Sequence, residues 1–174
     1  MTAQIQERLQ FDGETYGMAN EPLRQYFAKN EIDIRLNAPS TACWRGYFGE
    51  WEVVDNKLYL TKLKGSGVIK DKEKYRVERL ALRRKLKEGL ITPIENGKLL
   101  KLMEKECWAA IQLSLNSLFQ SEEKVFACWY SGTIRAPFGE LIEYIHAGYE
   151  SIFEYELLID IKEGVVVNIW EKQN

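Results

Sequence analysis

The sequence is poor in the residues that most often bind metals or carry out catalysis. Its single histidine in 174 residues is His146, and its three cysteines are scattered without a C-x-x-C pair. No H-x-x-x-H pair and no calcium-loop spacing occurs, so no metal site is predicted. The segment GSG at 65–67 is not followed by the Gly-Lys-Ser/Thr of a phosphate-binding loop. The sequence therefore predicts neither a metal nor a cofactor.

Cysteine usage and the lack of long apolar runs predict the cellular location of the protein. Cys43, Cys107 and Cys128 cannot all pair within one chain, which predicts three reduced, buried thiols. No run approaches the roughly eighteen apolar residues of a membrane-spanning helix. The first residues also lack the basic-then-apolar layout of a secretory signal. We therefore expect a cytoplasmic protein with no membrane partner.

The composition is that of a folded domain in which charge is unevenly distributed. Hydrophobic residues make up 45% of the chain and charged residues 29%, which predicts one globular domain over 1–174. The net charge of −2 gives no overall attraction to nucleic acid, so no nucleic-acid partner is expected. Segment 70–87 nevertheless has nine basic residues against three acidic ones, whereas 138–164 has seven acidic residues and one lysine.

Short turn sequences between alternating apolar residues predict three β-hairpins. A two-residue hairpin turn needs residues that tolerate positive φ at both positions. The three dipeptides are Asp12-Gly13, Asp55-Asn56 and Glu163-Gly164. In the middle hairpin, Trp51 and Val53 are expected to face the core. Gly46 and Gly49, in the strand that contains Trp51, indicate a bulge or a place where another group approaches the backbone closely.

In the last third of the chain we expect a buried strand over 124–135, a turn at 136–139, and a strand or short helix over 140–149. One face of the final hairpin is predicted to combine residues from both of its strands, namely Leu157, Ile159, Ile161, Val165, Val167 and Ile169.

Helical spacing predicts a short N-terminal helix within 20–30, with Asn20 as its cap. The segment 70–87 is predicted to be a helix with one buried edge and a solvated basic face, and Gly89 is expected to end it. The thin apolar edge of this helix consists of Val77, Leu80, Ala81 and Leu86.

The segment 98–113 fits both a helix and a strand. We favour a helix to about Lys105, a strand over 107–113 and a short helical turn capped by Ser114. The predicted fold is therefore α+β and β-rich, with one or more largely antiparallel sheets built from hairpins. It has a short N-terminal helix and a basic, partly helical, insertion-like segment over 65–105.

Aromatic and arginine residues form the main candidate binding set. Arginine flanked by Trp or Tyr on a strand is costly to bury unless it pairs with a carboxylate or a ligand anion, and both alternatives stay open for Arg45. Tryptophan, tyrosine and arginine are favoured at binding hot spots, although half of this set is expected to be core. The candidates are Trp44, Arg45, Tyr47, Trp129, Tyr130, Arg135, Tyr144, His146 and Tyr149. A secondary basic face consists of Arg79, Arg83, Arg84 and Lys85.

No catalytic arrangement is recognisable. Ser131, in WYSG, does not lie in the G-x-S-x-G of a nucleophile elbow. Cys43 and Cys128 are next to tryptophans in segments expected to be apolar strands, where a thiol has a raised pKa and low reactivity. A cysteine that meets His146 in space would not be visible in the sequence. No catalytic residue is therefore predicted.

Two blocks, 43–60 and 125–161, carry the patterns W-R-G-Y-x-G-x-W and W-Y-S-G. Together with 11–23 they resemble a family of small, uncharacterised bacterial proteins. The resemblance implies a bacterial, cytoplasmic, compact α+β protein and transfers no catalytic residue.

Two functional hypotheses follow. The first is a non-catalytic binding protein for a protein partner, such as an immunity or antagonist protein. The second is a small-molecule enzyme or sensor that uses the aromatic, arginine and histidine cluster.

Overall fold

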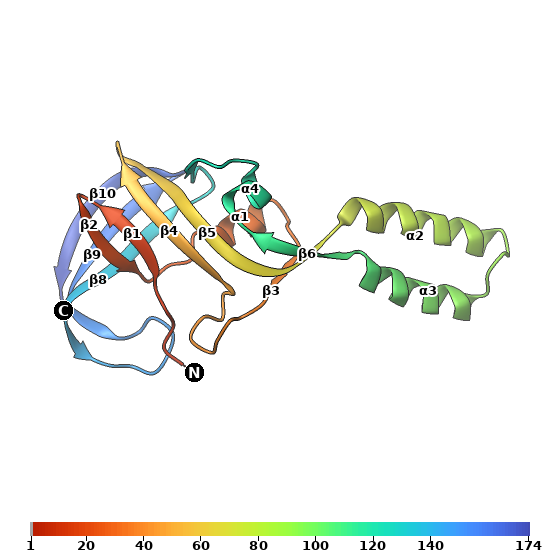
Figure 1. The fold of residues 1–174 in the computed structure, drawn as a ribbon, viewed down its shortest axis with the longest axis horizontal. Helices are drawn as coiled ribbons and strands as arrows, with labels where there is room; N and C mark the ends of the chain where they lie inside the picture. Colours follow the sequence, from red (N-terminus) through yellow and green to blue (C-terminus); the bar gives the residue numbers. More distant parts are fainter. Residues whose placement is uncertain (1) are drawn as a thin grey trace.

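A computed structural model describes residues 2–174 of the chain (Figure 1). These residues form one sheet, which has both antiparallel and parallel strand pairs, and four helices. The strands are β1 (Glu7–Phe11), β2 (Glu14–Met18), β3 (Ile34–Leu36), β4 (Tyr47–Val54), β5 (Lys57–Lys70), β6 (Trp108–Leu113), β7 (Val125–Phe126), β8 (Gly132–Glu143), β9 (Ile152–Lys162) and β10 (Val165–Gln173). The helices are α1 (Leu23–Lys29), α2 (Lys72–Lys87), α3 (Pro93–Glu106) and α4 (Leu115–Phe119). The predicted α+β class is confirmed.

Local turn chemistry accounts for the three hairpins. Both central residues of each turn have positive φ, as the sequence predicted for this turn type. The hairpins pair β1 with β2, β4 with β5, and β9 with β10. The β4–β5 pair is irregular between Glu50 and Trp51, directly after Gly49. Hairpins therefore supply most of the antiparallel pairing.

The sheet is strongly curved. Its strand order is β2-β1-β4-β5-β10-β9-β8, and β3, β6 and β7 also pair with β5. All of these pairs are antiparallel except β1–β4, which is parallel and was not predicted. The terminal strands β2 and β8 pack together, and Ala19 N donates to the carbonyl of Arg135 at 2.8 Å. The curvature encloses one core.

The core is made of apolar side chains from the inner faces of the strands. Leu9, Trp51, Leu58 and Ile159 are among those that are fully buried. Helices α1 and α4 pack partly buried aromatic side chains against this core, and the ring of Phe119 on α4 stacks 5.2 Å from that of the buried Trp129. Buried aromatic side chains contribute a large part of the free energy that stabilises a protein core.

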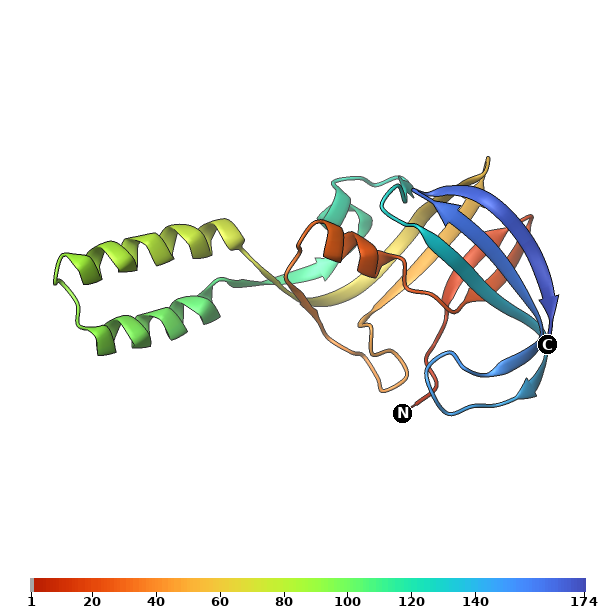
Figure 2. The same ribbon diagram turned by 180° about the vertical axis from the view of Figure 1, so that it is seen from behind.

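Helices α2 and α3, residues 72–106, form an arm that projects from the ends of β5 and β6 (Figures 1 and 2). Capping fixes both helix starts: Asp71 accepts from Lys74 N at 2.9 Å, and Thr92 and Glu95 form a capping box. The predicted order of a helix, strand β6 and a short helix capped by Ser114 is confirmed. None of the described helices has both the length and the apolar character needed to cross a membrane.

The predicted buried edge of the basic helix is wrong. Val77 and Leu80 are 55% and 57% exposed, and no residue of α2 is buried. The side that faces α3 instead includes Leu82, which lines a small hollow together with Met103. Helix α2 packs mainly against α3, and its first turn also touches the sheet, where Lys70 Nζ of β5 lies 4.0 Å from the centre of the Tyr75 ring.

Four other local predictions are corrected. Residues 127–131 form a turn between β7 and β8, not a continuous strand, because Tyr130 N bonds back to Ala127 O at 2.9 Å. Residues 136–139 belong to β8 and not to a turn. Its Pro137 is tolerated because β8 pairs only with β9 in the sheet order. Asn20 does not cap α1, because its side chain bonds to the backbone of Thr133 and Arg135.

The fourth correction concerns the predicted face of the final hairpin. Strand β10 has a register shift between Val166 and Asn168, and Val165 pairs with Lys162. The three predicted residues of β10, Val165, Val167 and Ile169, are all exposed, whereas the three predicted residues of β9 are buried. One bulge residue is enough to change which side chains share a face.

Candidate functional site

The nine candidate residues do not gather in one place. Tyr47, Trp129 and Tyr130 are buried in the core. Trp44 is 66% exposed, and Tyr144 is 60% exposed. The described contacts join the remaining candidates in separate groups.

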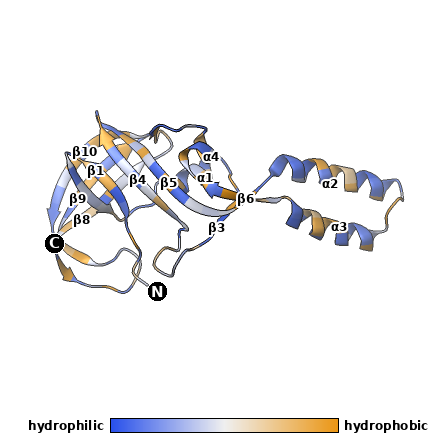
Figure 3. Cartoon of the chain, viewed as in Figure 1, coloured by the Kyte–Doolittle hydropathy of each residue, from blue (hydrophilic) through white to orange (hydrophobic). Residues whose placement is uncertain are grey.

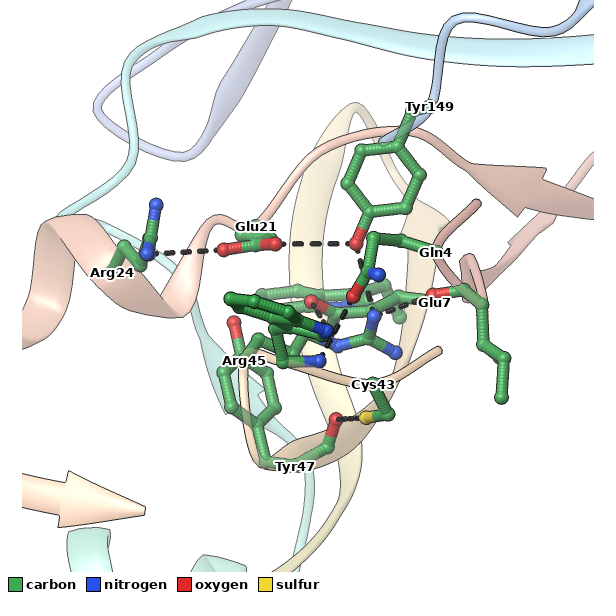
Figure 4. Close-up of polar contacts among 11 residues, drawn as sticks. Gln4, Glu7, Glu21, Arg24, Cys43, Arg45, Tyr47 and Tyr149 are labelled. Atoms are coloured by element: carbon green, nitrogen blue, oxygen red, sulfur yellow. Dashed lines mark hydrogen bonds and ion pairs between the residues drawn. The ribbon is translucent and has the colours of Figure 1, made fainter. Parts of the chain in front are cut away.

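The first group is a buried ion pair between Arg45 and Glu7 (Figure 4). Their side chains are 1% and 0% exposed, and Arg45 Nε lies 3.6 Å from Glu7 Oε1. The other carboxylate oxygen, Oε2, accepts a hydrogen bond from Trp51 Nε1 at 2.6 Å. Arg45 Nη1 donates to the carbonyl of Ile5 and, at 2.9 Å, to Tyr149 Oη. Of the two alternatives for Arg45, the structure shows burial against a carboxylate.

The parallel pairing of β1 with β4 explains how the ion pair forms. Leu9 lies opposite Trp51, and Glu7 is two residues before Leu9, so both side chains point into the core. Gly49 leaves the space that the carboxylate needs, because a Cβ there would be 2.0 Å from Glu7 Oε2. The close approach that the sequence indicated at Gly49 is confirmed.

Burial dominates the electrostatics of this group. Desolvation raises the pKa of Glu7 to about 7, against the opposing effects of the Trp51 hydrogen bond and the Arg45 charge. Burial also raises the pKa of Tyr149 to about 12. Within residues 2–174, Glu7 Oε1, Arg45 Nη2 and the Tyr47 hydroxyl have no hydrogen-bond partner. No substrate atom can reach the carboxylate of Glu7, so its place is structural.

A surface hollow of about 280 Å³ lies against this ion pair. Glu21 connects the hollow to the interior: it accepts from Tyr149 Oη at 3.2 Å, and its other oxygen is 3.0 Å from Arg24 Nε. Trp44 is held by its backbone N–H, which donates to Gln4 Oε1 at 2.9 Å. The lining residues are Thr2, Gln4, Glu21, Arg24, Trp44, Arg45 and Gly148. An exposed indole beside charged groups could bind a flat polar molecule.

The other candidates make local contacts. Arg135 Nη2 lies 2.7 Å from Glu156 Oε1, and Tyr144 Oη is 3.1 Å from His146 Nδ1. Within residues 2–174, no serine or cysteine side chain is hydrogen-bonded to His146. The described residues also contain no group of three or more His, Cys, Asp or Glu placed to hold a metal ion.

The thiols differ from the expectation in one respect. Cys43, Cys107 and Cys128 are free, but Cys128 is exposed because it lies in the turn between β7 and β8. The prediction of three buried thiols is therefore wrong for Cys128. Cys43 lies in the loop before β4 and not in a strand, although it is fully buried.

The secondary basic face lies on α2, on the arm. Arg79, Arg83, Arg84 and Lys85 are all exposed, and none of the four makes an ion pair within residues 2–174. The coloured ribbon shows hydrophobic segments between the hydrophilic ones on both arm helices (Figure 3). A groove of about 210 Å³ on α2 combines both kinds of side chain, and its lining residues are Tyr75, Arg76, Arg79, Leu80 and Arg83.

Sequence reasoning missed Glu7, Glu21 and the exposed apolar residues of the arm. Glu7 is two residues before Leu9 and Phe11 two after it, so the alternation of the strand could have placed the carboxylate on the core face. Comparisons with family models, curated proteins and solved structures found no match to this chain.

Proposed function

We propose that the chain is a non-catalytic protein-binding domain and that the arm is its binding element. One observation carries the proposal: α2 projects from the sheet with no buried residue and exposes apolar side chains, among them Val77 and Leu80. Beside them are three arginines that make no ion pair within residues 2–174, namely Arg79, Arg83 and Arg84. Exposed apolar residues ringed by charge are typical of interaction sites. Arginine at such a site favours a partner whose surface has carboxylates around apolar residues.

The arm has the features that a protein interface needs. The groove on α2 combines Tyr75 and Leu80 with three arginines, of which Arg76 is paired with Glu73 and Arg79 and Arg83 make no ion pair within residues 2–174. Opposite charge on the partner would increase the association rate and fix the orientation of the two proteins. An antagonist or immunity protein that blocks an acidic partner would use such a surface.

Photo-crosslinking in the native host tests this function. A photoreactive residue at Val77 on the arm is compared with one at Asn116 on α4, which is also exposed. We expect a discrete protein adduct from position 77 only, and we expect Arg79→Glu with Arg83→Glu to abolish it. Lys29→Glu with Lys64→Glu reverses two exposed charges elsewhere and should leave the adduct intact. Equal labelling at both positions would overturn the proposal.

The hollow beside Trp44 supports a second candidate function, that of a small-molecule sensor. The supporting observation is the exposed indole of Trp44 next to Arg24 and Glu21. Thermal-shift screening against aromatic carboxylates and amino acids tests it, with Trp44→Ala as the variant. A ligand that stabilises the wild-type chain and not the variant supports this candidate, whereas equal shifts or no shifts exclude it for these ligands.

A further inference from the structure

The end of the molecule farthest from the arm has the opposite charge. Residues 139–156, here called the acidic end, contain five glutamates and no lysine or arginine. They run from the end of β8 into β9. Eight basic residues against two acidic ones give α2 a net charge of +6. One of the five glutamates, Glu156, is buried and paired with Arg135, and the other four are not ion-paired within residues 2–174. The small net charge of the whole chain therefore conceals two segments of opposite charge.

Apolar side chains accompany the charge at the acidic end as they do on the arm. Leu141, Ile142 and Tyr144 are exposed, and Glu140 and Glu143 are their neighbours along the chain. Within residues 2–174, neither Glu140 nor Glu143 makes an ion pair. The acidic end therefore exposes carboxylates and apolar groups, which are complementary to the arginines and the exposed apolar residues of the arm.

The arm cannot reach the acidic end of its own chain. Asn174 N donates to Glu154 O at 3.1 Å, which places the acidic end beside the C-terminus. Figures 1 and 2 show the C-terminus and the arm at opposite ends of the longest axis. The arm can therefore contact an acidic end only when that acidic end belongs to a second molecule.

We propose that the arm of one molecule binds the acidic end of a second copy of this chain. The inference rests on the proposed function, because it uses the arm as the binding element and names its partner. The contact is head-to-tail, so a pair of molecules keeps one free arm and one free acidic end, and assembly continues until a ring closes or a filament forms. Both surfaces are solvent-exposed, so salt screens the attraction.

Sedimentation of the full chain at two salt concentrations tests the proposal. At roughly 0.02 M salt we expect a weight-average mass that rises with protein concentration to two or more chains, and at roughly 0.5 M salt we expect one chain, because the Debye length shortens. A wild-type chain that stays monomeric at low salt overturns self-association. An arm adduct with a different protein in the crosslinking experiment would then leave the proposed function standing.

Charge reversal distinguishes this contact from any other. Arg79→Glu with Arg83→Glu should give monomers, and Glu140→Lys with Glu143→Lys should do the same. An equimolar mixture of the two variants restores the opposite charges and should recover dimers or larger species. Lys29→Glu with Lys64→Glu is the matched control and should still associate. All of these side chains are exposed, so circular dichroism melts should coincide. Association that persists in either reversed variant, or a mixture that stays monomeric, overturns the proposal.

Discussion

The curved sheet buries an arginine and a glutamate among aromatic side chains, whereas the longer helix of the arm buries nothing at all. The sheet is held by packing over its whole inner face, so most substitutions there disturb many neighbours. The arm is held by helix caps, by one seam between α2 and α3, and at its base by Lys70 of β5, which contacts Tyr75 and Glu104. Stability therefore resides mainly in the sheet. The exposed charge and apolar area that are available for binding reside mainly on the arm.

The largest expected effect is the loss of Trp51. Its side chain is fully buried and also donates to Glu7 Oε2, so Trp51→Ala leaves both a cavity and a buried carboxylate without its donor. We expect the free energy of unfolding to fall by about 3–5 kcal/mol. Urea denaturation followed by circular dichroism measures this.

Trp44 provides the matched control within the same loop-and-strand block. Because its indole is mostly exposed, Trp44→Ala should change the free energy of unfolding by no more than about 0.5 kcal/mol. Equal destabilisation by the two variants would contradict the division of this block into core and surface.

The second prediction concerns the pH dependence that Glu7 gives to the sheet. The pKa of Glu7 is about 7 in the folded chain, whereas its ordinary value, taken here for the unfolded chain, is 4.5. Between these two pH values the folded chain therefore binds more protons than the unfolded chain. The free energy of unfolding should therefore fall as pH rises through this window, by about 3 kcal/mol from this group alone. Glu7→Gln stays neutral and should lose this part of the pH dependence.

Urea denaturation of the wild-type chain and of Glu7→Gln at pH 5 and pH 8 measures the effect. The comparison cancels the other titrating groups, which both chains share. The advantage of the variant over the wild type should be larger at pH 8 than at pH 5. A constant difference at the two pH values would show that the carboxylate titrates near its ordinary pKa.

The parts of the fold that could be predicted are those that neighbouring residues determine. Asp12-Gly13 and Asp55-Asn56 form their turns because both positions accept positive φ, whatever lies elsewhere in the chain. The cap at Ser114 and the helix over α3 are local in the same sense. The turns and the Ser114 cap lie where they were predicted, whereas α3 begins at Pro93, before the predicted helical segment that starts at 98.

The parts that could not be predicted depend on contacts distant in sequence. Arg45 has two possible settings in the sequence, and only the parallel pairing of β1 with β4 brings Glu7 to it. The strand expected over 124–135 is interrupted because Gly164 N bonds to Tyr130 O at 2.9 Å, a contact made by the turn of another hairpin. Helical periodicity likewise could not show that Val77 faces solvent, since that depends on where α3 lies.

A smaller effect is expected from changes on the arm. Arg83→Gln, Arg84→Gln and Lys85→Gln remove three exposed charges that make no ion pair within residues 2–174. The melting temperature should stay within a few degrees of the wild-type value, because surface substitutions typically change stability by less than about 0.5 kcal/mol. A large decrease in differential scanning calorimetry would show that the arm contributes to the stability of the sheet.

The smallest expected effect is the difference in thiol reactivity between the turn and the packed regions. Cys128 is exposed in the turn between β7 and β8, whereas Cys43 and Cys107 are buried at the sheet and at its junction with the arm. Burial also raises the pKa of Cys107, which lowers its thiolate fraction. A chromogenic disulfide reagent should therefore label one thiol per folded chain rapidly and all three in urea. Cys128→Ser should abolish the rapid phase with no measurable change in unfolding, whereas rapid labelling of Cys107 would show that the base of the arm opens in the folded protein.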